Sequence, residues 1–149
     1  MNRYWCTFTV GLVLCATAAR AQEPQQLEGK WTFASLNVGG SVLDDARRST
    51  LEVYFLKDEF ELKGKVLEEI IKAKFTIDEK AKTFDFEPTV GPEKGKVSKG
   101  LYEFKVAKSD GGEKVTLRIY FAQPGSERPK KIEDKVVEGN FLWVLEKSK

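Results

Sequence analysis

The chain alternates apolar and polar residues with a period of two, the spacing that places every second side chain on the same face of a β-strand. In the stretch IKAKFTI, Ile71, Ala73 and Phe75 fall on one face, whereas Lys72 and Lys74 fall on the other. Eight such stretches follow one another along the chain. They predict strands at residues 28–38, 51–56, 59–65, 68–77, 83–87, 97–107, 114–122 and 140–146.

Consecutive strands with mostly short connections predict an antiparallel meander. Each predicted strand has one apolar and one charged face, which suits a barrel around one core. Closure of the sheet into a barrel also removes its two exposed edges. We therefore expect an all-β fold, a single eight-stranded antiparallel up-and-down barrel. After the first strand, VLDDARRS predicts a short helical turn, for which Ser41 followed by Asp44 resembles a capping box.

Large aromatic residues dominate the predicted inward faces. Each ring contributes about 1.5–3 kcal/mol when it is fully buried. Eight strands enclose room either for packed side chains or for one small ligand, and so many rings predict a mostly filled lumen with at most a small pocket. The inward set is Trp31, Phe33, Phe55, Phe60, Phe75, Phe84, Phe86, Tyr102, Phe104, Phe121 and Trp143.

The first 21 residues have the features of a secretory signal peptide. Arg3 precedes an apolar run, and Ala19-Arg20-Ala21 fits a cleavage site. The run is too short for a membrane span, which needs about 20 residues. An alternative is lipoprotein anchoring at Cys15, although Leu14 is bulky where such sites need a small residue. We therefore expect export to the periplasm or the extracellular space, a disordered leader at residues 22–26 and one domain at residues 27–149.

Removal of the signal peptide leaves few chemically reactive side chains. Both cysteines, Cys6 and Cys15, lie within it, and the chain has no histidine. Ser–His and Cys–His nucleophiles and metal sites of histidine or thiolate are therefore excluded. The remaining chain has as many basic as acidic residues, unlike the basic domains that bind nucleic acids. We predict no catalytic residues, no metal, no cofactor, no nucleic-acid partner and no integral membrane span in the mature chain.

The stretch VGPEKGKVS, residues 90–98, resembles a phosphate-binding loop only in its glycines and lysines. Gly91 and Gly95 are one residue too close together, and Val97 stands where a magnesium-binding hydroxyl is needed. A predicted strand follows, so no helix N-terminus is available for a phosphate. The stretch is therefore interpreted as a loop between strands, with Pro92 among the residues that fix its turns.

Five segments carry a resemblance to a known family. LEGKW, VGPEKGK, GLYEF, LRIYFAQPGSERP and LWVLEK, in this order, resemble a lipocalin-like domain family of unknown function that is abundant in secreted planctomycete proteins. The resemblance covers about residues 26–147. Tyr120 stands where we expect the family often to carry cysteine, so any role for a thiol is absent here. The most specific matches include Gly91, Pro92, Gly95, Pro124, Gly125 and Pro129.

The first predicted strand also carries the tripeptide Gly29-x-Trp31, which resembles the lipocalin G-x-W signature. In lipocalins this tryptophan plugs the closed end of the barrel beneath a basic side chain that follows the last strand. The resemblance implies this covering position for Lys147.

In an up-and-down barrel, alternate loops emerge at the same end. The longer connections are therefore expected to share one end, the mouth, where loops on a rigid scaffold often carry function. The motifs around Gly91 and Pro124 are then expected to meet. Basic and acidic residues are equally numerous across these connections, which are residues 39–50, 64–69, 88–96 and 123–139.

The candidate ligand-binding residues are Lys94, Lys96, Tyr102 and Arg128. Arg128 has two interpretations, either a clamp for a ligand carboxylate or a bond to Glu93 that ties two loops together.

Two functions remain open. The first is a secreted, non-enzymatic lipocalin-like module that binds a small apolar or amphipathic ligand at the mouth, and the second is a cell-envelope protein-interaction or structural module with a filled barrel. An apolar cavity of more than about 300 Å³ favours the first. A filled barrel with an exposed apolar patch favours the second.

Overall fold

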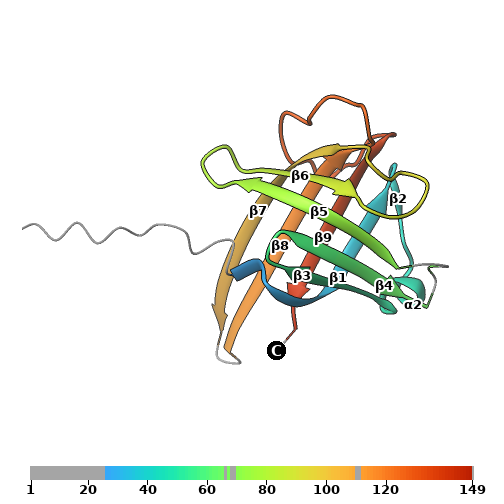
Figure 1. Cartoon of the computed structure of the whole chain (residues 1–149). Coiled ribbons are helices and arrows are strands. Elements are labelled where there is room, and N and C mark those ends of the chain that lie inside the picture. The colour runs from blue at the N-terminus through green and yellow to red at the C-terminus, as the bar shows by residue number, and fades with distance from the viewer. Residues whose placement is uncertain (1–25, 66, 68–69, 110–111, 149) are drawn as a thin grey trace, which may run out of the picture.

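A computed structural model describes residues 26–148, apart from residues 66, 68–69 and 110–111. The expected signal peptide, with Cys15, and residues 22–25 of the expected leader lie outside the described residues. The described chain forms a curved antiparallel sheet that closes on itself, with one short helix (Figure 1). The elements are β1 (Gly29–Val38), β2 (Ser41–Val42), α2 (Asp45–Arg48), β3 (Leu51–Leu56), β4 (Glu59–Gly64), β5 (Ile71–Asp78), β6 (Thr83–Pro88), β7 (Ser98–Ser109), β8 (Gly112–Ala122) and β9 (Asn140–Lys147).

The sheet closes because β1 pairs with β9, the last strand. The strands are ordered β2-β1-β3-β4-β5-β6-β7-β8-β9, and neighbouring strands are antiparallel. At the closing seam Trp31 lies opposite Lys147, and Val38 lies opposite Phe141. The expected eight-stranded up-and-down barrel is confirmed, and β2 is a short addition beside β1.

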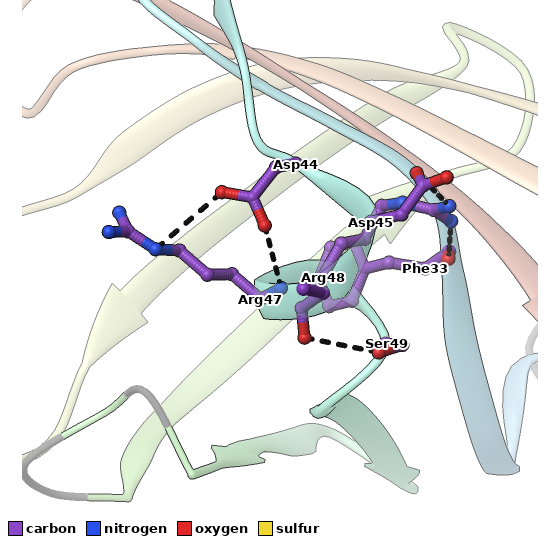
Figure 2. A network of polar contacts seen from close by, with 7 residues as sticks. Phe33, Asp44, Asp45, Arg47, Arg48 and Ser49 are labelled. Carbon is purple, nitrogen blue, oxygen red and sulfur yellow. Dashed lines mark hydrogen bonds and ion pairs between the residues drawn. The ribbon is translucent and has the colours of Figure 1, made fainter.

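The helix α2 forms where the sequence predicts a helical turn, but its cap differs from the expectation. Asp44 is the N-cap, and its Oδ1 accepts a hydrogen bond from the backbone N–H of Arg47 at 2.9 Å (Figure 2). Ser41 pairs with Val38 in the β1–β2 hairpin instead. The expected capping box at Ser41 is therefore wrong, because the hairpin extends through this residue and the helix begins later.

One arginine attaches α2 to the barrel wall. Arg48 donates a hydrogen bond to the backbone carbonyl of Phe33 on β1, and it also pairs with Asp45 at 2.6 Å (Figure 2). The helix and the connection that carries it are thereby held against β1.

The aromatic residues predicted to face inward form one continuous core. All of them are buried except Phe104, which is half-buried and packs against the others. Many of the rings meet edge to face, which is a favourable arrangement for aromatic pairs. The ring centre of Phe55, for example, lies 6.3 Å from that of Trp31 and 5.5 Å from that of Phe75. The predicted inward phase of the strands is confirmed.

Trp31 fills the closed end of the barrel, where β1 begins. Its indole Nε1 donates a hydrogen bond to the carbonyl of Leu27 at 2.7 Å. Lys147 Nζ lies 5.6 Å from the centre of the Trp31 ring and donates a hydrogen bond to the carbonyl of Gln26. The covering position that the resemblance implies for Lys147 is therefore confirmed.

A second, smaller core lies on the outside of the barrel. Tyr120 faces outward from β8, yet it is buried with Val136 and Leu142. Ile132 also packs against this group. Because Val136 and Ile132 belong to the connection between β8 and β9, this connection covers part of the outer sheet. The alternation of apolar and polar residues did not predict this outer core, because residues 123–139 were expected only to form a loop at the mouth.

Candidate functional site

A cavity of about 620 Å³ lies at the mouth of the barrel. Its floor is formed by aromatic rings from the strands, including Phe86, Phe121 and Trp143. The Phe121 ring centre lies 4.9 Å from that of Phe86 and 5.2 Å from that of Trp143, in both cases nearly perpendicular. These mutual contacts fix the floor in place without a ligand.

The expectation of a mostly filled lumen is therefore wrong for the half of the barrel near the mouth. The physical reason is the order of residues along each strand. On β7, the inward positions nearest the mouth are Ser98 and Gly100, and the rings Tyr102 and Phe104 come only deeper in the barrel. The small residues Ser98 and Gly100 thus leave space at the mouth beside the rings of Phe86, Phe121 and Phe141.

The rim of the cavity comes from three connections. Leu67 and Ile70 contribute from the β4–β5 connection, Gly91 and Pro92 from the β6–β7 connection, and Pro124 from the β8–β9 connection. The expected meeting of the motifs around Gly91 and Pro124 is confirmed. Gly91 has a φ angle of +85°, which an L side chain rarely adopts, so glycine suits this turn.

The fourth connection expected at the mouth does not reach the cavity. Among the described lining residues, none comes from segment 39–50. In that segment Leu43 packs against the main core, and Arg48 holds α2 to β1.

Apart from Trp143, which carries an indole N–H, only two of the described lining residues, Ser98 and Glu93, have polar side-chain groups. Ser98 lies on the inward face of β7 and is 2% exposed. Glu93 lies on the rim, and its carboxylate is 3.1 Å from Lys96 Nζ. The cavity therefore combines an apolar wall, one hydroxyl and one acidic group. Ser98 shares the period-two phase of Tyr102 in VSKGLYEF, so the sequence did contain a signal for its inward position.

Arg128 lies away from the cavity and is bound to the outer side of the barrel. Its two Nη atoms donate hydrogen bonds to the two carboxylate oxygens of Asp85 at 2.6 and 2.8 Å, and one of them also donates to the carbonyl of Gly100 at 2.7 Å. The alternative that pairs Arg128 with Glu93 is wrong, because Glu93 pairs with Lys96 instead. Arg128 nevertheless has a tying role, since it anchors the β8–β9 connection to β6 and β7.

The other candidate ligand-binding residues also lie outside the cavity wall. Lys96 is engaged with Glu93, and Lys94 is exposed beside it. Tyr102 is buried in the main core, with Lys82 Nζ 5.4 Å from the centre of its ring. None of Lys94, Lys96, Tyr102 and Arg128 is among the described lining residues. Four of the wall residues, Phe60, Phe86, Phe121 and Trp143, were predicted as inward core residues, and Gly91, Pro92 and Pro124 were predicted as structural motif residues.

The resolved pKa shifts belong to ion pairs on the outer face of the barrel. Hydrogen bonds from Lys63, and secondly from Lys72, lower the pKa of Glu61 to about 2. A hydrogen bond from Lys30 likewise lowers the pKa of Glu52 below its usual value. These carboxylates crosslink the outer surfaces of neighbouring strands and do not line the cavity.

Two features are absent from the described part of the chain. No group of three or more histidine, cysteine, aspartate or glutamate residues there could hold a metal ion. No helix within the same residues is long and apolar enough to cross a membrane.

Comparisons of the chain with protein-family models, curated proteins and solved structures found no match.

Proposed function

We propose that this protein is an exported, non-enzymatic, lipocalin-like binding protein that holds a small, largely apolar molecule at the mouth of its barrel. The observation that carries the proposal is the cavity of about 620 Å³ with a largely apolar wall. Sites for small molecules in proteins usually enclose about 300–1,000 Å³ and combine apolar walls with a few polar groups.

The construction of the cavity supports a binding role, because the site exists before a ligand arrives. Its floor rings contact one another, and the strands beneath them belong to a closed sheet. A preformed site avoids the entropic cost of ordering loops and side chains during binding. The free energy of binding would come mainly from removing apolar ligand surface from water.

The proposed export is consistent with such a role. Residues 1–21 have the pattern of a signal peptide, so the mature chain would work in the periplasm or outside the cell. A molecule with a large apolar surface is poorly soluble in these aqueous compartments, and a barrel that encloses it would keep it in solution.

A second candidate function is a protein-interaction module of the cell envelope. It is supported by apolar side chains that remain exposed close to the mouth, among them Ile70, Ile71 and Val90, which are 45%, 37% and 41% exposed. A partner protein would cover such residues. The cavity disfavours an interaction module whose barrel is completely filled.

Native mass spectrometry tests the proposed function on protein purified from its own envelope. We expect the wild-type protein to carry a small molecule, and the variant Ser98→Phe to lose it because the new ring occupies the cavity. Lys99→Phe is the matched control, since Lys99 is the exposed neighbour on the same strand. A folded wild-type protein that is always free of small molecules, or a ligand that Ser98→Phe retains, would contradict the proposal.

A further inference from the structure

We propose that the cavity selects uncharged amphiphiles and discriminates against anionic ones such as fatty-acid carboxylates. This inference depends on the proposed function and specifies the ligand class of the same site. Two observations carry it. Apart from the indole N–H of Trp143, the polar side-chain groups of the described wall are a hydroxyl and a carboxylate, and Arg128, Lys96 and Lys131 of the mouth connections are already paired with other groups.

Ion pairs occupy Arg128, Lys96 and Lys131, which an anionic ligand could otherwise meet near the mouth. Arg128 satisfies both carboxylate oxygens of Asp85 and the carbonyl of Gly100, so its guanidinium would have to leave three hydrogen bonds to meet a ligand. Lys96 is paired with Glu93 on the rim itself. Lys131, in the β8–β9 connection, is paired with Glu133. Arg47 and Arg48 pair with Asp44 and Asp45 in the segment that does not reach the cavity.

Glu93 makes the entrance unfavourable for a negative charge. It is the one ionisable residue among the described residues that line the cavity. At the rim, a carboxylate head group would meet a carboxylate that is already paired with Lys96, and not a free cation. If it entered deeper, it would be buried against aromatic rings without a cationic partner, which strongly disfavours an ionised group.

Ser98 gives a neutral polar head group a partner inside the wall. Its side chain belongs to a residue that is 2% exposed on the inward face of β7. A serine hydroxyl both donates and accepts hydrogen bonds, so it matches an alcohol, an ester or an amide on an otherwise apolar ligand. The ligand class that fits the wall is therefore an uncharged molecule with a large apolar body and a small hydrogen-bonding group.

Competition with a neutral fluorescent dye tests this selectivity. The purified mature protein is titrated with Nile red at neutral pH, and the bound dye is then displaced with decanol or with decanoate, which have the same chain length and differ in charge. We expect decanol to displace the dye at a concentration at least about tenfold lower than decanoate needs, because an unpaired buried charge is strongly disfavoured.

Four substitutions, one of them a control, assign the selectivity to individual residues. Glu93→Gln is expected to strengthen decanoate binding and to leave decanol binding unchanged, whereas Glu127→Gln, which removes an exposed carboxylate that is not part of the described cavity wall, should change neither. Ser98→Ala is expected to weaken decanol binding roughly three- to tenfold, the effect of one hydrogen bond. Lys94→Ala should leave decanoate binding unchanged, because this exposed lysine is not expected to act as a clamp.

The outcomes separate this inference from the proposed function. If Nile red, decanol and decanoate all fail to bind the folded protein, both proposals are wrong. If Nile red binds but decanoate competes as well as decanol or better, or decanol does not compete at all, the cavity still binds ligands and only the selectivity is wrong. A loss of decanoate binding in Lys94→Ala would also overturn it, because a rim cation would then hold the anion.

Discussion

Replacement of Arg128 by alanine should destabilise the barrel without affecting ligand binding. The guanidinium forms two hydrogen bonds to Asp85 and one to the carbonyl of Gly100, between side chains that are 29% and 26% exposed. Hydrogen bonds to charged groups contribute about 1.5–3 kcal/mol each when they are buried. Partial exposure reduces such values, since exposed ion pairs contribute only about 0–1 kcal/mol. We therefore expect a loss of about 2 kcal/mol in the free energy of unfolding.

Urea denaturation followed by tryptophan fluorescence measures this loss. With a denaturant slope of about 1–3 kcal/mol per molar for a small domain, the midpoint should fall by about 1 M. Lys131→Ala breaks a more exposed pair with Glu133, with side chains 77% and 36% exposed, and should change stability by less than about 0.5 kcal/mol. A double-mutant cycle of Arg128→Ala with Asp85→Ala should give a coupling energy of more than about 1 kcal/mol. A midpoint for Arg128→Ala equal to that of the wild type would refute the tying role.

The same variant separates the two interpretations of Arg128. Because the guanidinium is bound to the outside of the barrel, Arg128→Ala should keep the wild-type affinity for Nile red and for decanoate when it is measured without urea. A specific loss of decanoate binding in the folded variant would instead support the carboxylate clamp.

Two further predictions concern the barrel wall and its outer ion pairs. Gly100→Ala should lower the free energy of unfolding by about 1–3 kcal/mol through overpacking, because an added Cβ would lie 2.7 Å from the Cβ of Phe121. The urea midpoint should fall accordingly, and an unchanged midpoint would show that the strands can separate. Glu61→Gln should reduce stability at about pH 6 and lose its effect in acid. The pKa of Glu61 is lowered from 4.5 to about 2 by Lys63 and Lys72, so its stabilising contribution is present above its usual pKa and disappears as the pH falls toward 2. The urea midpoints of the wild type and of Glu61→Gln should therefore converge as the pH falls. A constant difference between them would contradict the role of the ion pairs with Lys63 and Lys72.

Much of the fold could be predicted because it depends on local alternation. The pattern around Ile71 and Phe75 defines the two faces of a strand, and consecutive strands with short connections leave few arrangements other than a meander. The resemblance around Trp31 also gave the covering position of Lys147. Each of these predictions uses neighbouring residues or the order of elements, and the structure agrees with them.

The cavity and the anchoring of its loops could not be predicted in the same way, because they depend on depth and on distant pairs. Alternation shows that Ser98 and Tyr102 face inward, but it does not show that Ser98 lies at the mouth and leaves space there. Similarly, Arg128 and Asp85 are distant in sequence and meet only because the β8–β9 connection folds back over the outer sheet. The outward Tyr120 is buried for the same reason.

The central claim is that a closed antiparallel barrel presents a preformed apolar cavity that holds a small molecule. A crystal structure of the mature protein grown with decanol tests it most directly. The account predicts a closed seam between β1 and β9 and electron density for the alkyl chain against Phe86, Phe121 and Trp143, with the hydroxyl toward Ser98. Side chains that collapse into the mouth and leave no room for a ligand, or an alkyl chain bound only on the outer surface, would contradict it.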